Sequence, residues 1–172
     1  MTSLYKQSIP VFTKYLNNLS HLLKMGAAHA DEKAIKHDDI INFRLISDMR
    51  GLAFHVQSCC NTAVWFADRV GNLPHTPVDD NETTFEDFQA RIESTLAYLE
   101  GIKPEVLDDK LDKPVVIEAK SGNFKIVGGQ AYFSECAMPN FHFHLTTAYC
   151  LLRTQGVPVG ALDYLKDVFV KE

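Results

Sequence analysis

Two histidines and an asparagine stand among aromatic residues in segment 139–149, at the start of a long apolar stretch. Imidazole is the side chain that changes charge most readily near neutral pH, and it is the commonest metal ligand. His144 has the helical spacing of the apolar residues Phe141 and Ala148, so we expect it to face the protein core. A histidine in that position needs a bonded partner, a ligand or a metal, and we predict His144 as the central acid/base group.

A second helical segment, residues 47–70, supplies the best partner for this imidazole. Asp48, Gly51, His55, Cys59 and Thr62 follow one another at spacings of 3, 4, 4 and 3, which places them on one stripe of a helix. We predict that His55 and Asp48 face His144 across a pocket between helices, the usual place for a site in a helical bundle. The alternative is that these residues have only structural roles. His144 would then be a hydrogen-bonded histidine in the core and His55 would lie at the edge of the bundle. Asp48 would cap its helix or pair with Arg44 or Arg50.

Aromatic residues on both segments favour a hydrophobic or aromatic substrate. Phe54, Trp65, Phe141 and Phe143 are expected to form the pocket wall, with Asn140 and Tyr149 as orienting donors. The residues that we predict to contact the substrate are Phe54, Cys59, Trp65, Asn140, Phe141, His142 and Tyr149.

A metal site requires more ligands than this pattern supplies. His142 lies two residues before His144, which is about 200° round a helix. The natural next ligand one turn after His144 is Ala148, which has no donor atom. We therefore predict no cofactor and no metal ligands, with a divalent metal held through irregular geometry as the alternative.

The periodicity of apolar residues predicts an all-α fold. Helices are expected over residues 9–30, 47–70, 83–101 and 131–155, the third starting with a Thr83–Glu86 capping box. Residues 31–39 and 72–82 are predicted loops, and Pro139 predicts a break that makes the last helix begin twice. β-branched residues at 114–119 and a turn at 121–123 predict a hairpin returning over 124–127. The expected architecture is four main helices with this small hairpin inserted before the last long one.

Bulk properties narrow the class of protein. The 172 residues predict one domain spanning 1–172. A net charge of −5 without a basic cluster disfavours nucleic-acid binding. We expect no membrane association, because there is no signal-peptide pattern and no apolar run of roughly 18 residues. The cysteines lack a C-x-x-C arrangement, which favours a reduced, cytoplasmic protein; they are Cys59, Cys60, Cys136 and Cys150.

Motifs along the whole chain carry a resemblance to a known family. They are the run 139–144 with residues 146–149 and 151–153, the segments 44–49 and 156–160, and the N-terminal stretches 4–5 and 9–12. This pattern resembles a bacterial and fungal family catalogued as a domain of unknown function, and that family is similar to the DinB/YfiT-like superfamily. The resemblance implies an all-α, DinB-like, up-and-down four-helix bundle, often dimeric, whose relatives include thiol-dependent transferases and isomerases. Many of those relatives hold a divalent metal on three histidines.

This chain departs from the family pattern at several positions. Ala148 stands where the third histidine is expected, and His55, Asn61 and Val64 stand where the family tends to have glutamine, aspartate and lysine. We therefore expect retuned pocket chemistry.

The functional expectation combines both arguments. It is a homodimeric intracellular enzyme, an isomerase or lyase without a cofactor, acting on a small molecule such as a secondary-metabolite intermediate by isomerisation, elimination or cyclisation. The alternatives are a metal-dependent DinB-like transferase and a non-catalytic dimeric protein that binds a small molecule.

Overall fold

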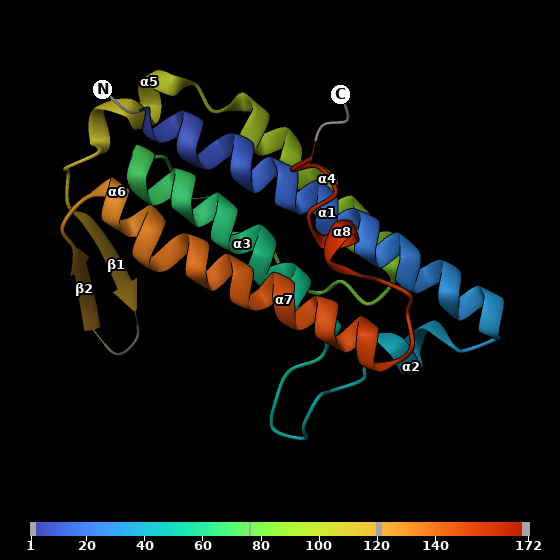
Figure 1. Ribbon diagram of the computed structural model, residues 1–172. Coiled ribbons are helices and arrows are strands. Elements are labelled where there is room, and N and C mark those ends of the chain that lie inside the picture. The colour runs from blue at the N-terminus through green and yellow to red at the C-terminus, as the bar shows by residue number, and fades with distance from the viewer. Residues whose placement is uncertain (1–2, 76, 120–121, 170–172) are drawn as a thin grey trace.

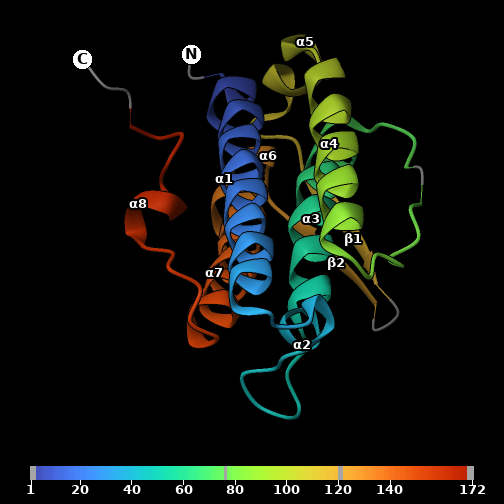
Figure 2. The same cartoon turned by 90° about the vertical axis from the view of Figure 1, so that its right-hand side faces the viewer.

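The computed structural model describes residues 3–75, 77–119 and 122–169, and these are mostly helical with one small antiparallel hairpin. Figures 1 and 2 show the long helices lying alongside one another, with the hairpin at the side of the bundle, near α6. The long helices are α1 (Leu4–Lys33), α3 (Leu52–Gly71), α4 (Phe85–Gly101) and α7 (Met138–Thr154). The shorter elements are α2 (His37–Ile41), α5 (Pro104–Leu107), η1 (Asp108–Lys110), α6 (Gly129–Ala131), η2 (Tyr132–Ala137) and α8 (Ala161–Tyr164), with strands β1 (Val115–Ala119) and β2 (Gly122–Ile126).

Helix α1 is longer at both ends than its sequence predicts. It begins at Leu4, because the Ser3 hydroxyl accepts the backbone N–H of Lys6 as an N-cap. Asp108, more than a hundred residues away, accepts hydrogen bonds from Ser3 Oγ and the Tyr5 N–H, both at 2.9 Å. The predicted loop over 31–39 is wrong, since it contains the last turn of α1 and the start of α2.

Helix α3 starts five residues later than the sequence predicts. Gly51 is its N-cap, and a Cβ atom on Gly51 would lie only 3.1 Å from the Ile41 carbonyl oxygen. The chain therefore approaches the end of α2 so closely that a side chain there would push the neighbouring backbone aside by a few tenths of an ångström. Residues 42–51 form a loop that projects from the bundle in Figure 1. Asp48 lies in this loop and not on α3, so the prediction that it shares one helix face with His55 and Thr62 is wrong.

Helix α4 begins with a capping box, as predicted, but the box lies one residue further along the chain. The capping box joins Thr84 and Asp87 in place of Thr83 and Glu86. The Asp87 carboxylate accepts the backbone N–H of Thr84 at 3.0 Å, and the Thr84 hydroxyl accepts that of Asp87 at 3.1 Å. The box thus satisfies donors that a helix leaves free in its first turn.

The long helices do not alternate strictly in direction, so the predicted up-and-down order is wrong. On α3 and α4, Asn61 bonds Arg91 and Asp68 bonds Tyr98, a step of seven residues forward on each helix. These two helices are therefore parallel, and the segment between them runs back along α3. In contrast, α7 is antiparallel to α3, since His55 and Thr62 pair with His144 and Asn140.

The hairpin forms where it was predicted, but with other bounds. Strands β1 and β2 pair in the register Val115 with Ile126. Gly122 and Asn123, predicted in the turn, belong to β2, and residue 121 lies outside the described residues. Pro139 does not break the last helix. A π-helical turn, η2, precedes it, in which the Met138 N–H donates to the Phe133 carbonyl. The wider turn admits Pro139, which has no N–H, into the first turn of α7.

Buried phenylalanines from different helices form the centre of the core. Phe12 packs against Phe66, Phe133 and Phe141 with ring centroids 5.6, 5.8 and 5.2 Å apart. This cluster fixes α7 against α1 and α3, and so sets the position of His144. Among the described residues, none of the helices has the length and apolar character needed to cross a membrane.

Candidate functional site

The imidazoles of His55 on α3 and His144 on α7 are in direct contact. Their Nδ1 atoms lie 3.0 Å apart and their ring centroids 5.2 Å apart. Both side chains are buried, with 2% of His55 and 8% of His144 exposed. Two histidines that are 89 residues apart in the chain thus form one unit, which we call the histidine dyad.

The dyad can hold its shared proton on only one of the two rings. In a neutral imidazole one nitrogen is a donor and the other an acceptor, so an Nδ1–Nδ1 hydrogen bond requires opposite tautomers. The Nε2 atom of His55 is buried and has no hydrogen-bond partner among the described residues. A buried nitrogen without a partner is uncommon in a protein core.

Burial keeps both rings uncharged at neutral pH. Burial, followed by the charge of His55, lowers the pKa of His144 to about 4. The pKa of His55 is also lowered by burial, which a backbone group of Arg50 partly opposes. The dyad therefore offers nitrogen lone pairs at neutral pH, and a proton taken by one ring can be stabilised by the Nδ1 of the other.

Two exposed phenylalanines cover the dyad. Phe54 meets His55 and His144 edge-on at 5.5 and 5.6 Å, and Phe143 lies 5.1 Å from His144. Phe54 is 42% exposed and Phe143 57% exposed. The imidazoles therefore lie one side chain below the surface.

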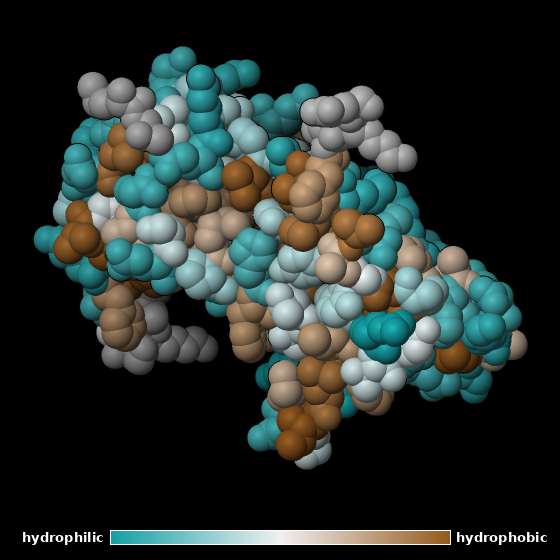
Figure 3. All heavy atoms as spheres, in the orientation of Figure 1, coloured by the Kyte–Doolittle hydropathy of each residue, from teal (hydrophilic) through white to brown (hydrophobic). Residues whose placement is uncertain are grey.

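An apolar loop lies near this surface. Leu45 and Ile46, which lie in the loop 42–51, are exposed too. Apolar side chains also gather on the part of the molecule that projects below the bundle in Figure 3. The guanidinium of Arg50 lies 5.7 Å from the Phe54 ring. Phe54, with the Arg50 guanidinium beside it, thus lies between the dyad and the surface.

The other residues that were predicted on α7 make structural contacts around the dyad. Asn140 donates to the Thr62 hydroxyl at 2.8 Å, and the Tyr149 hydroxyl donates to the Val159 carbonyl at 3.4 Å. Phe141 is completely buried, and its carbonyl accepts the thiol of Cys59. Burial raises the pKa of that thiol well above its ordinary value, so Cys59 is a packed thiol in the site wall.

His142 has a partner that sequence reasoning did not find. Its Nδ1 lies 2.8 Å from the hydroxyl of Tyr164 in α8, and its ring packs edge-on against Tyr15 at 4.6 Å. No pattern in the sequence links α8 to α7. The pairing arises from the way in which the last segment folds back over α1 and α7.

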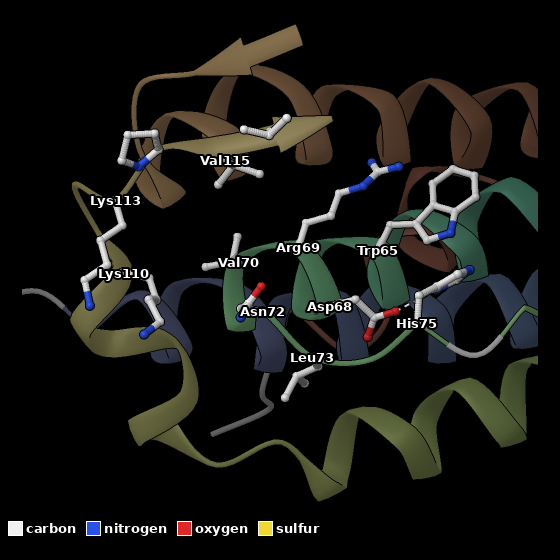
Figure 4. A pocket seen from close by; sticks show the side chains of 12 residues that line it. Trp65, Asp68, Arg69, Val70, Asn72, Leu73, His75, Lys110, Lys113 and Val115 are labelled. Atoms are coloured by element: carbon white, nitrogen blue, oxygen red, sulfur yellow. Dashed lines mark hydrogen bonds and ion pairs between the residues drawn. The ribbon is translucent and has the colours of Figure 1, made fainter. Parts of the chain in front are cut away.

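Two predicted residues lie away from the dyad. Asp48 is exposed in the loop 42–51, and the hydrogen bonds and ion pairs of the described residues do not involve its carboxylate. Trp65 lies on the far half of α3 and lines two cavities there, one of about 860 Å³ (Figure 4) and one of about 290 Å³. Neither cavity is lined by His55 or His144.

The dyad does not fit a three-ligand metal site. His55 and His144 supply two donors, and Ala148 leaves the position one turn further on without a ligand atom. Within the described ranges, His, Cys, Asp and Glu side chains form no group of three that could hold a metal ion. Proton exchange on the imidazoles is the chemistry that these residues can carry out themselves.

Comparison with known proteins places this arrangement among the DinB-like helical proteins. A crystal structure of a DinB family member from Shewanella denitrificans is 33% identical, with a TM-score of 0.84 over 94% of this chain and 91% of that one. The chain belongs to the family described as "Domain of unknown function (DUF1993)", whose model matches residues 4–165. No curated protein shows significant similarity to it. The resemblance inferred from the sequence motifs is thus confirmed.

Proposed function

We propose that this protein is a cytoplasmic, homodimeric small-molecule enzyme in which the histidine dyad moves a proton on its substrate. The reaction class is isomerisation, elimination or cyclisation, and the long helices serve as a DinB-like four-helix bundle that holds the two rings. The observation that carries the proposal is the Nδ1–Nδ1 contact of 3.0 Å between two buried imidazoles.

His144 is the group that exchanges the proton with substrate. Its ring lies against exposed Phe143, whereas His55 is the more buried of the two. When His144 takes up a proton, both its nitrogens become donors and the Nδ1 of His55 can accept one of them. His55 thus orients the ring and spreads the charge, as the partner of a catalytic base commonly does.

The substrate is a small hydrophobic or aromatic molecule. Phe54 and Phe143 present exposed ring faces above the dyad, and aromatic pairs gain about 0.5–1.5 kcal/mol beyond area burial. A bound aromatic group would exclude water from the dyad, which strengthens hydrogen bonding at the reacting atoms.

Deuterium exchange tests this proposal without knowledge of the product. Wild-type protein is incubated in deuterated buffer with a panel of aryl ketones and aryl β-hydroxy ketones, and loss of carbon-bound protons is followed by NMR. We expect exchange in at least one compound, its loss in His144→Gln and a reduced rate in His55→Gln. His142→Gln, which alters a neighbouring imidazole outside the dyad, should retain exchange.

A non-catalytic small-molecule-binding protein is the second candidate. It is favoured by the two cavities on the far half of α3, whose linings contain neither imidazole of the dyad. No exchange across the panel by wild-type protein, or exchange that survives in His144→Gln, would contradict the enzyme and leave this second function.

A further inference from the structure

The smaller of the two cavities beside α3, about 290 Å³ in volume, lies between α3, α4 and the chain that follows α3. Trp65, Asp68 and His75 line both cavities, so the two adjoin at these residues. Asp68 lies 13 residues after His55 in the sequence, which is about 20 Å along a helix. The smaller cavity is therefore separate from the histidine dyad.

A buried carboxylate holds a histidine at this cavity. Asp68 is 5% exposed, and its Oδ2 accepts the Nδ1–H of His75 at 2.8 Å. Figure 4 marks this contact with a dashed line. The other carboxylate oxygen of Asp68 accepts the hydroxyl of Tyr98, so the carboxylate is held from two sides. A neutral imidazole that carries its proton on Nδ1 presents Nε2 as an acceptor, and this is the polar atom that His75 can offer to a ligand.

The polar side chains at the opposite end of the lining are bonded to protein groups. The Arg91 guanidinium donates to Asn61 at 2.6 Å and to Asp80 at 3.3 Å. Asn61 in turn donates to Asp80 at 3.1 Å. The hydroxyls of Ser94 and Thr95 donate to the Arg91 carbonyl, each at 2.9 Å. These groups therefore satisfy one another without a ligand.

Two polar side-chain atoms of the lining form no hydrogen bond with the rest of the described chain, the Nε2 of His75 and the indole nitrogen of Trp65. The first is an acceptor and the second carries a donor N–H, so a hydroxyl group can pair with both. In the view of Figure 4, the indole nitrogen lies on the edge of its ring that is turned towards His75. This part of the cavity therefore favours a ligand that carries a hydroxyl.

Apolar side chains form much of the remaining lining and select an apolar ligand body. They are Val64, Trp65, Pro74, Pro77 and Val78. The volume of about 290 Å³ lies at the lower limit for small-molecule pockets, which is about 300 Å³. A single aromatic ring suits this volume, and it gains from packing against the indole.

We propose that the smaller cavity is a second binding site, which takes a small phenol. The phenol hydroxyl donates to the Nε2 of His75, which Asp68 orients, and the phenol ring packs against Trp65. A phenol is a stronger donor than an aliphatic alcohol, and a carboxylate behind an imidazole supports positive charge on the ring. The site names a ligand for one of the cavities that favour the second candidate function, and it does not depend on catalysis at the dyad.

Trp65 is the only tryptophan of the chain, so its indole N–H gives a single NMR signal that reports on this region. Uniformly ¹⁵N-labelled protein is titrated with 4-ethylphenol and with its isomer 4-methylanisole, an ether of similar size that has no hydroxyl. We expect a saturable shift of the indole signal with 4-ethylphenol. The ether should bind about tenfold more weakly, because it cannot donate to His75.

His75→Phe tests the proposed hydrogen bond. It keeps a ring without nitrogen atoms, so it should bind 4-ethylphenol about tenfold more weakly while its affinity for the ether stays the same. The matched control is His37→Phe, because His37 also pairs with a carboxylate, that of Asp31, but lines neither cavity. This control should leave both affinities unchanged.

Two further variants separate the adjoining cavities. Ser94→Phe adds a bulky side chain to the lining of the smaller cavity and not of the larger one, so it should weaken the binding of both probes. Lys113→Gln alters only the lining of the larger cavity and should leave both affinities unchanged. The proposal is overturned by an indole signal that does not respond to 4-ethylphenol, by equal affinity for the two isomers, or by unchanged affinity in His75→Phe or Ser94→Phe. Any of these results would leave the enzyme proposal intact, because deuterium exchange at the dyad is measured separately.

Discussion

The Nδ1 atoms of His55 and His144 lie 3.0 Å apart in the core, although the residues belong to different helices. At this distance the two nitrogens share one proton. Protonation of both rings would bring two positive charges together. The dyad therefore links the protonation of the protein to its stability as well as to its proposed chemistry.

Stability should fall in mild acid because of His144. Its native pKa is about 4 and its ordinary value 6.5, so between these values the unfolded chain binds a proton that the native state lacks. The contribution is fully present above pH 6.5 and is lost as the pH falls towards 4. The expected loss is about 3 kcal/mol in the free energy of unfolding, measured by urea denaturation across this range.

The matched control is His144→Gln, which cannot titrate in this range. Its stability should decrease less with falling pH than that of the wild type. Parallel pH profiles for the two proteins would show that His144 is not held neutral by its surroundings.

Removing one ring of the dyad should cost more than the change in volume explains. His55→Phe or His144→Phe leaves the remaining Nδ1 buried without a partner, at about 1–3 kcal/mol each. The double variant should cost less than the two single variants together, with a coupling of about 1 kcal/mol, in a double-mutant cycle of unfolding free energies. Additive costs would mean that the Nδ1–Nδ1 bond contributes nothing.

Two phenylalanines on α7, two residues apart, test which face of the helix is buried in the core. Phe141 is completely buried against Phe12, so Phe141→Ala should reduce the free energy of unfolding by about 3–5 kcal/mol. Phe143 is 57% exposed, and Phe143→Ala should cost under about 1 kcal/mol. Similar losses for the two variants would contradict this placement of the helix.

Asp48 tests the correction to the sequence-based site. Its carboxylate is exposed in the loop 42–51, so Asp48→Asn should change stability by less than about 0.5 kcal/mol. Deuterium exchange by this variant should equal that of the wild type. A large loss of exchange would place Asp48 in the site after all, through movement of its loop.

Much of the fold could be predicted from local pattern. The apolar stripe that contains Phe66 and the stripe that contains Phe141 each repeat at helical spacing, because one face of each helix must be buried. The hairpin followed from β-branched residues and turn chemistry. His144 could be placed in the core for the same reason, since it shares the spacing of Ala148.

The predictions that failed depend on contacts between distant segments. Asp108 extends the start of α1 through Ser3, and the close approach of Gly51 to Ile41 delays the start of α3. Such contacts have no local signature. The parallel course of α3 and α4 depends likewise on the path of the intervening segment, which composition alone marks only as a loop.

By itself, then, the sequence determined which segments are helical, which face of each is apolar, and that His144 lies on a buried face, because side-chain periodicity acts within one helix. Only the tertiary structure decided that His55 is its partner at bonding distance, that Asp48 is not, and that Asp68 positions His75 beside a cavity. These contacts depend on the direction of each helix and on its position along its neighbours. Both are set by the packing of many side chains at once, which no single segment of sequence specifies.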